Sequence, residues 1–199
     1  MAKIITNMSM SLDGFVADTS DNPAQVFGWF MAGDVETPTG APGFSFRTSA
    51  ATAAYLSEAF ANNGALVCGR KYFDQVTQGG GWKGTHPMGD VPLFVVTHSV
   101  PDGWPREGSN VTIVTDGLES AVDQAKAVAG DRNVGVATAD ITQQLLNLGL
   151  LDEITVELVP VLLGSGVPFF ANLSKAPITL GQPTVIEGIG VTHLRYTVS

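Results

Sequence analysis

One stretch of the sequence combines a strand end with two cations. In LVCGRKYF (66–73), a predicted buried strand ends at Gly69 and is followed directly by Arg70 and Lys71. Backbone N–H groups at the start of a helix, together with a guanidinium, favour a bound phosphate. The same residues also fit the solvent-exposed first turn of a helix, so both interpretations stay open here.

Hydroxyl and imidazole groups follow a second apolar run. In LFVVTHS (93–99), Thr97, His98 and Ser99 come just after a predicted strand. Such side chains at the carboxyl end of a strand suit a phosphate or a ribose, and they also fit an ordinary polar turn. Two strand ends of this kind in one α/β sheet favour a dinucleotide site more than either does separately.

Asp13 is the candidate acid. SLDGFVA (11–17) holds its carboxylate in a tight turn after the first predicted strand, where apolar neighbours are expected to raise its pKa. Reduction of a C=N or C=O bond consumes a proton as well as a hydride, and a carboxyl group could position or relay that proton. The alternative is that Asp13 only forms an Asp-Gly turn.

Several other kinds of site are not supported. His86, His98 and His193 have no metal-like spacing with one another or with Cys68, so no metal site is expected. No Gly-x-Ser-x-Gly motif occurs. One Gly-x-Gly-x-x-Gly match, Gly79–Gly84, follows a helical turn and leads into Thr-His-Pro, which is the opposite of the dinucleotide-binding context. The composition of GGGWKGTHPMGD (79–90) predicts a mobile loop.

Composition limits the class of protein. The 199 residues, 44% hydrophobic and 15% charged, predict a single domain over 1–199 with one substantial core. A net charge of −9 argues against a nucleic-acid partner, although one small anionic ligand could still be held by local cations. The single cysteine, the lack of a signal-like N-terminus and the lack of a long apolar run predict a cytoplasmic protein without a membrane span.

Hydrophobic periodicity predicts strands that alternate with helices. The strand 152–163 has Ile154, Val156 and Leu158 on one face and Thr155 and Glu157 on the other. The other predicted strands are 3–10, 65–69, 93–98, 111–114 and 133–137, and the predicted helices are 23–31, 49–64, 70–76, 117–130 and 140–150. Alternation of this kind predicts a mostly parallel α/β sheet, and a terminal hairpin at 184–198 gives it an antiparallel edge.

Two finer expectations concern single segments. Residues 36–44 are expected to form a loop, because Pro and Gly are frequent there. The helix 117–130 is expected to bury one stripe of small and aliphatic side chains. That stripe consists of Leu118, Ala121, Val122, Ala125 and Val128.

These stretches, and above all LLNLGLLDEITVELVPVLLGSGVPFF (145–170), resemble the dihydrofolate reductase-like family. The similarity is to the reductase domain of bacterial riboflavin-biosynthesis deaminase-reductases and its stand-alone homologues, and it runs through nearly the whole chain. The resemblance implies an α/β three-layer fold: a mostly parallel twisted central sheet with an antiparallel C-terminal hairpin and helices on both faces. It also implies NADPH as cofactor, a pterin-like or pyrimidine-like substrate, and a possible homodimer, with the apolar hairpin 184–198 as a plausible interface.

The implied activity is that of an NADPH-dependent oxidoreductase, either 5-amino-6-(5-phosphoribosylamino)uracil reductase-like or dihydrofolate reductase-like. By position, the resemblance implies that residues 69–71 meet the cofactor phosphates and residues 97–99 the adenosine 2′-phosphate. It implies that Val16 and Ala17 border the nicotinamide. The substrate pocket would be faced by Asp13 and Trp29, and Gly79–Gly84 would be a flap near it.

The chain departs from the family in NVGVATADITQQLL (133–146). Relatives have glycines where this chain has Val136, Ala137 and Thr138, and Cβ atoms there would narrow the approach of a pyrophosphate. Asp140 and Gln143 resemble a capping box, whose carboxylate would occupy the helix N–H groups and repel phosphate. The sequence predicts a weakened cofactor site; the alternative is a non-catalytic or regulatory ligand-binding protein on the same fold.

Overall fold

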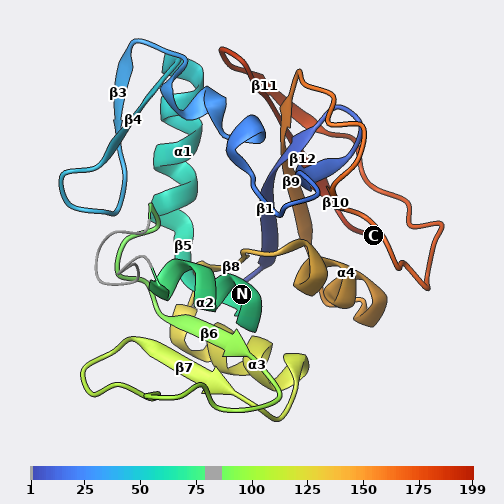
Figure 1. Cartoon of the computed structure of the whole chain (residues 1–199). Helices are drawn as coiled ribbons and strands as arrows, with labels where there is room; N and C mark the ends of the chain where they lie inside the picture. The colour runs from blue at the N-terminus through green and yellow to red at the C-terminus, as the bar shows by residue number, and fades with distance from the viewer. Residues whose placement is uncertain (1, 79–86) are drawn as a thin grey trace.

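An eight-stranded sheet forms the centre of the molecule (Figure 1). The structure is a computed structural model that describes residues 2–78 and 87–199. In spatial order, the strands are β11 (Thr184–Glu187), β12 (Thr192–Thr197), β9 (Glu153–Val159), β1 (Ile4–Ser11), β8 (Asn133–Val136), β5 (Asn63–Gly69), β6 (Leu93–Val96) and β7 (Val111–Val114).

The strands from β9 to β7 run parallel to one another, whereas β12 pairs antiparallel with β9 and β11 antiparallel with β12. The predicted mostly parallel sheet with an antiparallel C-terminal hairpin is therefore confirmed. Because parallel neighbours end at the same edge, the segments that follow β5, β6 and β8 emerge side by side.

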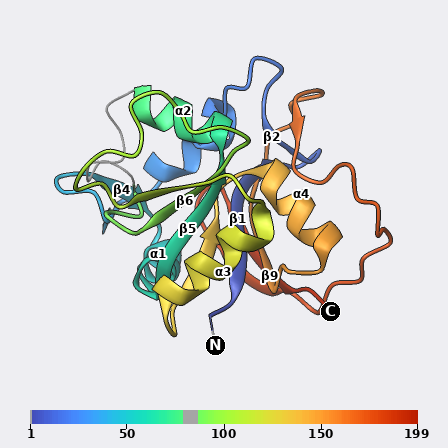
Figure 2. The same cartoon turned by 90° about the horizontal axis from the view of Figure 1, so that it is seen from below.

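Helices cover both faces of the sheet (Figure 1 and Figure 2). On one face, α3 (Leu118–Ala129) and α4 (Ala139–Leu148) pack on a core that includes Val67, Val134 and Val156. On the other face, α1 (Ala50–Asn62) and α2 (Arg70–Gln78) cover separate parts of the sheet and take part in two separate apolar clusters. The predicted three-layer arrangement is confirmed.

Alternation along β9 decides which side chains face which layer. Ile154 and Val156 belong to the core beneath α3 and α4, and Leu158 packs against it. Thr155 and Glu157 point to the opposite face, as predicted, but they are 3% and 1% exposed. That face of β9 therefore carries buried polar groups, which require hydrogen-bond partners within the protein.

Two predicted segments differ from the structure. Residues 23–31 form two short 3-10 turns, η1 (Ala24–Val26) and η2 (Gly28–Met31), with Gly28 at the junction. Part of the expected loop 36–44 is strand β3 (Val35–Pro38), which pairs antiparallel with β4 (Ser45–Thr48). This hairpin is held by a buried hydrogen bond of 2.7 Å between the hydroxyls of Thr37 and Thr48, a contact that local composition does not reveal.

The stripe predicted for α3 is correct except at its end. Leu118, Ala121, Val122 and Ala125 are buried, whereas Val128 is 53% exposed and Ala129 is buried in its place. By spacing alone, either Val128 or Ala129 could end the buried stripe. Ala129 is the buried residue because it packs beside β5.

A two-stranded sheet that the sequence did not reveal joins β2 (Phe15–Ala17) to β10 (Val167–Pro168). Both strands are too short to show a hydrophobic period. Their pairing brings the segment after β9 against the segment after β1. In the described part of the chain, no helix is long and apolar enough to cross a membrane.

The C-terminal end of α4 depends on a left-handed glycine. Gly149 has φ +73° and ψ 31°, and its N–H donates to the carbonyls of Leu145 and Leu146. We expect Gly149→Ala to lower the free energy of unfolding by about 1 kcal/mol, because a Cβ disfavours this conformation. Urea unfolding measures the change.

Gly28→Ala is the matched control, since an added Cβ at Gly28 meets no atom within 4 Å and its φ is not positive. The control should be neutral or stabilising by up to about 1 kcal/mol. Equal destabilisation by both substitutions would contradict the capping explanation.

Candidate active site

A cavity of about 960 Å³ lies between α1 and α2 on their face of the sheet. Its floor is the middle of the sheet, which neither helix covers. The floor residues are Ile5, Asn7 and Ser9 of β1, Gly135 of β8, and Thr155 and Glu157 of β9. Tyr55, Leu56 and Phe60 of α1 form one wall, and Arg70, Tyr72 and Val76 of α2 form part of the other.

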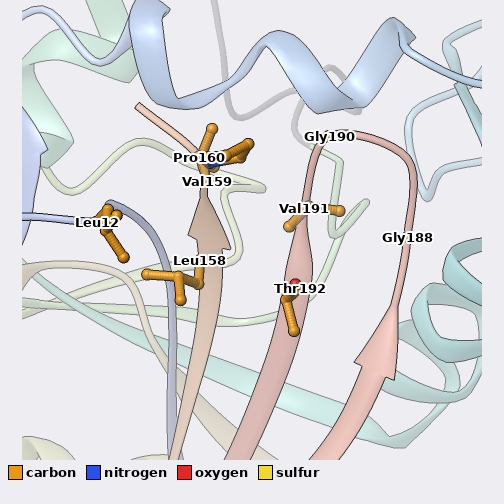
Figure 3. Close-up of a pocket in the computed structure, with 8 residues that line it drawn as sticks. All are labelled: Leu12, Leu158, Val159, Pro160, Gly188, Gly190, Val191 and Thr192. Atoms are coloured by element: carbon orange, nitrogen blue, oxygen red, sulfur yellow. The ribbon is translucent and has the colours of Figure 1, made fainter. Parts of the chain in front are cut away.

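A second cavity, of about 250 Å³, lies beyond the end of β9 beside the β11–β12 turn (Figure 3). Its lining is almost entirely apolar, from Leu12, Leu158–Pro160 and the turn residues up to Thr192. None of these side chains titrates or carries a charge, so the larger cavity is the candidate active site.

One end of the larger cavity collects residues that the sequence analysis predicted from separate stretches. Because β5 and β8 are parallel neighbours, with Val67 paired to Val136, their carboxyl ends lie together. The lining there includes Gly69, Arg70, Lys71, Val136, Ala137 and Thr138. The starts of α2 and α4 thus meet at one edge of the sheet.

The two cations at this end already have carboxylate partners. Arg70 donates through Nε to both oxygens of Asp74, at 2.8 and 2.9 Å, and its Nη1 lies 3.5 Å from the carbonyl oxygen of Ser99. Lys71 forms an ion pair with Asp21 at 2.6 Å. Exposed pairs of this kind contribute little to stability, so a phosphate could compete for either cation.

The turn at residues 136–138 is made without glycine and without backbone strain. Among the described non-glycine residues, positive φ occurs at Asp21 and Asn172 and not in this turn. The N–H of Ala137 donates to the carbonyl of Val67 at 3.1 Å, and its methyl group packs against the apolar cluster beneath α2. Val136, Ala137 and Thr138 therefore form this turn without a conformation that requires glycine.

The predicted capping box at the start of α4 is wrong. Asp140 accepts a hydrogen bond from Gln144 at 2.7 Å, one turn along the helix. The side-chain amide of Gln143 instead donates to the carbonyls of Pro168 and Phe169, at 3.3 and 3.0 Å. The contact with residues 168 and 169 thus keeps Gln143 from closing the box, and Gln144 occupies the Asp140 carboxylate.

The start of α4 is consequently left without a side-chain cap. Thr138 is the N-cap residue, but its side chain accepts no capping hydrogen bond. Its Oγ1 is buried and has no hydrogen-bond partner among the described residues. A helix N-terminus with unused donors and an unpaired hydroxyl is suited to an anion.

The turn Thr97–Ser99 lies at the same edge but outside the cavity lining. The hydroxyl of Thr97 donates to the carbonyl of Ser99 at 3.0 Å, and His98 is exposed. The contact between Arg70 and Ser99 places the turn beside the cation.

Asp13 also lies outside the cavity lining. Its Oδ1 accepts from the hydroxyl of Ser11 at 2.6 Å and the N–H of Leu163 at 3.1 Å, and its Oδ2 accepts from the N–H of Gly164 at 2.7 Å. The Ser11 hydroxyl and then the two backbone amides lower the pKa of Asp13 below its ordinary value of 3.8. The predicted rise is wrong, because the carboxylate is exposed and its ionised form receives hydrogen bonds.

The contacts of Asp13 help to place the wall formed by Val16 and Ala17. These residues are 7% and 5% exposed and line the cavity from β2. The segment held by Asp13 continues through Gly166, where a Cβ would lie 2.1 Å from the carbonyl oxygen of Ala17. Only glycine permits this approach at position 166.

Trp29 lies in the wall of the large cavity. It is 3% exposed, and its Nε1 donates to the hydroxyl of Ser9 at 3.0 Å. Gly79–Gly84, predicted as a flap, and His86 lie outside the described residues.

Sequence analysis missed a polar cluster at the cavity floor. Tyr55 donates to Oε1 of Glu157 at 3.0 Å and accepts from Asn7 at 2.8 Å. His193 Nδ1 lies 3.8 Å from the same Oε1. Burial, followed by the charge of Glu157, raises the pKa of Tyr55, so its hydroxyl keeps its proton. The sequence signal was limited to Glu157 on the polar face of β9, beside Thr155.

We expect Asp13→Asn to destabilise the protein at neutral pH and to matter less in acid. A carboxylate with a lowered pKa stabilises the fold above its ordinary pKa, and this stabilisation is lost as the pH falls through the lower, folded-state value. Urea unfolding at neutral pH and below about pH 3 should show the difference from wild type shrinking. Asp102→Asn, at an exposed position, is the control; a pH-independent difference for Asp13→Asn would refute the linkage.

Comparison with known proteins identifies the family. The family profile described as the RibD C-terminal domain matches residues 2–175. The uncharacterized protein YwjB of Bacillus subtilis (strain 168) is 30% identical over 90 residues, which are 45% of this chain and 49% of that protein. The chain thus matches about half the length of that relative.

Solved structures share the fold. A putative riboflavin biosynthesis protein from Shewanella sp. PV-4 has a TM-score of 0.68 at 23% identity, with 100% of this chain and 99% of that chain covered. Acinetobacter baumannii RibD (form 2) has a TM-score of 0.61 at 15% identity, with coverage of 100% and 58%. Dihydrofolate reductase from Enterococcus faecalis, complexed with NADP(H), has a TM-score of 0.58 at 13% identity, with coverage of 99% and 96%.

At sequence identities of 23% and below, the solved structures show only that the fold is shared. The family match spans most of the 199 residues, and the observed strand order and helix layers agree with it. The chain therefore belongs to the RibD C-terminal domain family and has the dihydrofolate reductase-like fold.

Proposed function

We propose that the protein is an NADPH-dependent reductase that transfers a hydride to a small pterin-like or pyrimidine-like heterocycle. The observation that carries the proposal is the uncapped start of α4, which meets the Gly69–Arg70 strand end at one end of the large cavity. Related folds support it: one is a dihydrofolate reductase complexed with NADP(H) and another a 5-amino-6-(5-phosphoribosylamino)uracil reductase.

The residues present suit the phosphates of NADPH. The positive end of the α4 dipole and the unpartnered Thr138 hydroxyl can bind one phosphate group. Arg70 can turn from Asp74 to bind a second phosphate group. The Asp140 carboxylate is engaged with Gln144, so it does not occupy the helix N–H groups, although its charge still opposes an anion.

The remaining length of the cavity suits the nicotinamide and the substrate. Val16 and Ala17 provide an apolar wall beyond the turn at 136–138, and Trp29 closes the far side over β1. A volume of about 960 Å³ is at the upper end of what single small-molecule pockets enclose, so it can hold cofactor and substrate portions together. When bound, NADPH supplies the hydride; the chain's own residues orient the rings and exclude water.

Asp13 is a positioning residue in this proposal. Its carboxylate is occupied by three hydrogen bonds outside the cavity, and through Gly164 it holds the segment that packs on Ala17. The homodimer and the role of the 97–99 turn at the 2′-phosphate remain part of the proposal. Arg70 Nη1 close to Ser99 supports the second of these.

Titration of tryptophan fluorescence with NADPH tests the proposal, followed by absorbance measurement of NADPH oxidation. The two substrates to assay are 7,8-dihydrofolate and 5-amino-6-(5-phosphoribosylamino)uracil. We expect cofactor binding and oxidation with at least one of them. No binding up to millimolar NADPH would refute the proposal. Tight binding without oxidation of either substrate would favour a non-catalytic ligand-binding protein.

Arg70→Ala should weaken NADPH binding by about 1–3 kcal/mol, the range for loss of a charge-assisted hydrogen bond. Arg47→Ala is the matched control, because Arg47 lies on β4 and does not line the cavity. Fluorescence titration of both variants gives the comparison. An unchanged dissociation constant in Arg70→Ala would show that this cation does not contact the cofactor.

Thr138→Val separates cofactor binding from stability. Valine is nearly isosteric with threonine and removes a buried hydroxyl that has no partner among the described residues. We expect the variant to be at least as stable as wild type without NADPH, and to bind NADPH more weakly by about 1 kcal/mol. Urea unfolding and fluorescence titration measure the two effects; loss of stability with unchanged binding would contradict the assignment.

A further inference from the structure

We propose that Glu157 protonates the bound substrate and that His193, directly behind it, returns the proton, with Tyr55 holding the carboxyl group in place. The inference rests on the proposed reductase function, because hydride addition to a C=N or C=O bond requires a proton at the heteroatom. The proposed acid, Glu157, therefore lies on β9 and its proton source, His193, on β12. Asp13, in the turn after β1, is not the acid.

The pair is buried but reaches the cavity. Glu157 and His193 are each 1% exposed, and their closest nitrogen and oxygen are 3.8 Å apart. Glu157 lines the cavity and His193 does not. A substrate can therefore touch the carboxyl group, while the imidazole can act only through it.

One oxygen of Glu157 is committed and the other is available. Oε1 accepts from the hydroxyl of Tyr55, and it is also the atom that faces His193. Oε2 accepts no hydrogen bond from any described residue. Asn7, which donates to the Tyr55 hydroxyl, also lines the cavity beside it. Tyr55 retains its proton because burial raises its pKa, so it orients the carboxyl group and does not replace it as the acid.

Strand register places this group near the expected cofactor end. On β1, Thr6 pairs with Val136 of β8, and on its other side Ser9 pairs with Glu157 of β9. The carboxyl group is therefore two strand spacings, roughly 10 Å, across the sheet from the turn that starts α4. A ring stacked over β1 lies between the two.

A chain of hydroxyls leads from the pair to the surface. His193 Nε2 lies 3.0 Å from the hydroxyl of Thr52, which accepts from the hydroxyl of Ser49 at 3.1 Å. Ser49 is the half-exposed N-cap residue of α1. His193 Nδ1 has no hydrogen-bond partner among the described residues, so this nitrogen is available to exchange a proton with Glu157.

The proposed step balances. With NADPH as the hydride donor, a C–H bond would form at the carbon of a C=N bond, the π bond would break, and its electron pair would move to nitrogen. That nitrogen takes the proton of the Glu157 carboxyl group, and the oxidised cofactor would be released as NADP⁺. The Glu157 carboxylate then takes a proton from the His193 imidazolium, which is recharged through Thr52 and Ser49.

The surrounding charges leave Glu157 as the available acid. Glu153 is paired with Lys3, and Glu58 with Arg195 at 3.7 Å. Arg195 on β12 also lies over the Tyr55 ring, 5.9 Å from its centre. The titratable or charged groups that face the pair are thus Tyr55 and Glu58 of α1 and Arg195 of β12. Trp29 contacts the His193 ring through an aromatic edge.

Glu157→Gln tests the proposal, with Glu187→Gln on the exposed edge strand β11 as the matched control. We expect Glu157→Gln to lower kcat about 100-fold at saturating substrate, a typical contribution of a general acid. NADPH affinity should stay within about twofold of wild type, which also shows that the variant folds. The limb of the pH–kcat profile assigned to the acid should disappear, and Glu157→Asp should restore part of the activity.

A binding measurement gives a readout that does not depend on turnover. With NADP⁺ present, we expect Glu157→Gln to weaken the binding of pterin about tenfold, because the hydrogen bond that the carboxyl O–H donates to the ring is lost. The control should not change it. His193→Gln should alter the pH profile while leaving pterin affinity unchanged, and it serves as the test if Glu157→Gln does not fold.

The outcomes separate this inference from the proposed function. If wild type does not bind NADPH, the reductase proposal fails and the acid assignment fails with it. If wild type binds and oxidises NADPH while Glu157→Gln keeps its kcat, its pH profile and its pterin affinity, only the assignment of Glu157 is overturned.

Discussion

The parallel pairing of β5, β8 and β1 is the constraint on which the candidate site depends. It brings the starts of α2 and α4 to one edge of the sheet, although Gly69 and Thr138 are far apart in the sequence. Because α1 and α2 cover separate parts of the same face, the middle of the sheet stays uncovered and becomes a cavity floor. A continuous helical layer would have buried that floor. The pairing therefore supplies both the sheet edge and the cavity on which the proposed cofactor and substrate site depends.

Local patterns predicted the elements and the strand ends well. Gly69–Lys71 and the turn at 136–138 both line the large cavity, and their place at the end of a strand and the start of a helix is encoded within a few residues. The polarity of the two faces of β9 was also predicted from simple alternation. Whether a polar face meets solvent or a cavity depends on the neighbouring elements, so the burial of Glu157 could not be predicted in the same way.

The errors arose where partners distant in sequence override local chemistry. Asp13 resembled an acid in an apolar turn, but its ligands include the amides of residues 163 and 164, and these lower its pKa. Asp140 and Gln143 have the spacing of a capping box, but the loop at 168–169 takes the glutamine. The cluster of Tyr55, Glu157 and His193 is formed by residues of α1, β9 and β12, and no local sequence motif predicts it.

In the proposed cofactor site, the acidic character of the chain shifts the basis of phosphate binding from cations to the backbone. Arg70 and Lys71 are each matched by an aspartate, so around this edge the positive charge is neutralised before a ligand arrives. The start of α4 has no such competitor, since Asp140 is engaged with Gln144 and Thr138 does not cap the helix. Helix N–H groups cannot be neutralised by a neighbouring carboxylate that points elsewhere, and they bind an anion without reorganisation. In the proposed function, an acidic protein whose turn at 136–138 contains no glycine therefore keeps a site for an anionic cofactor at the uncapped start of α4.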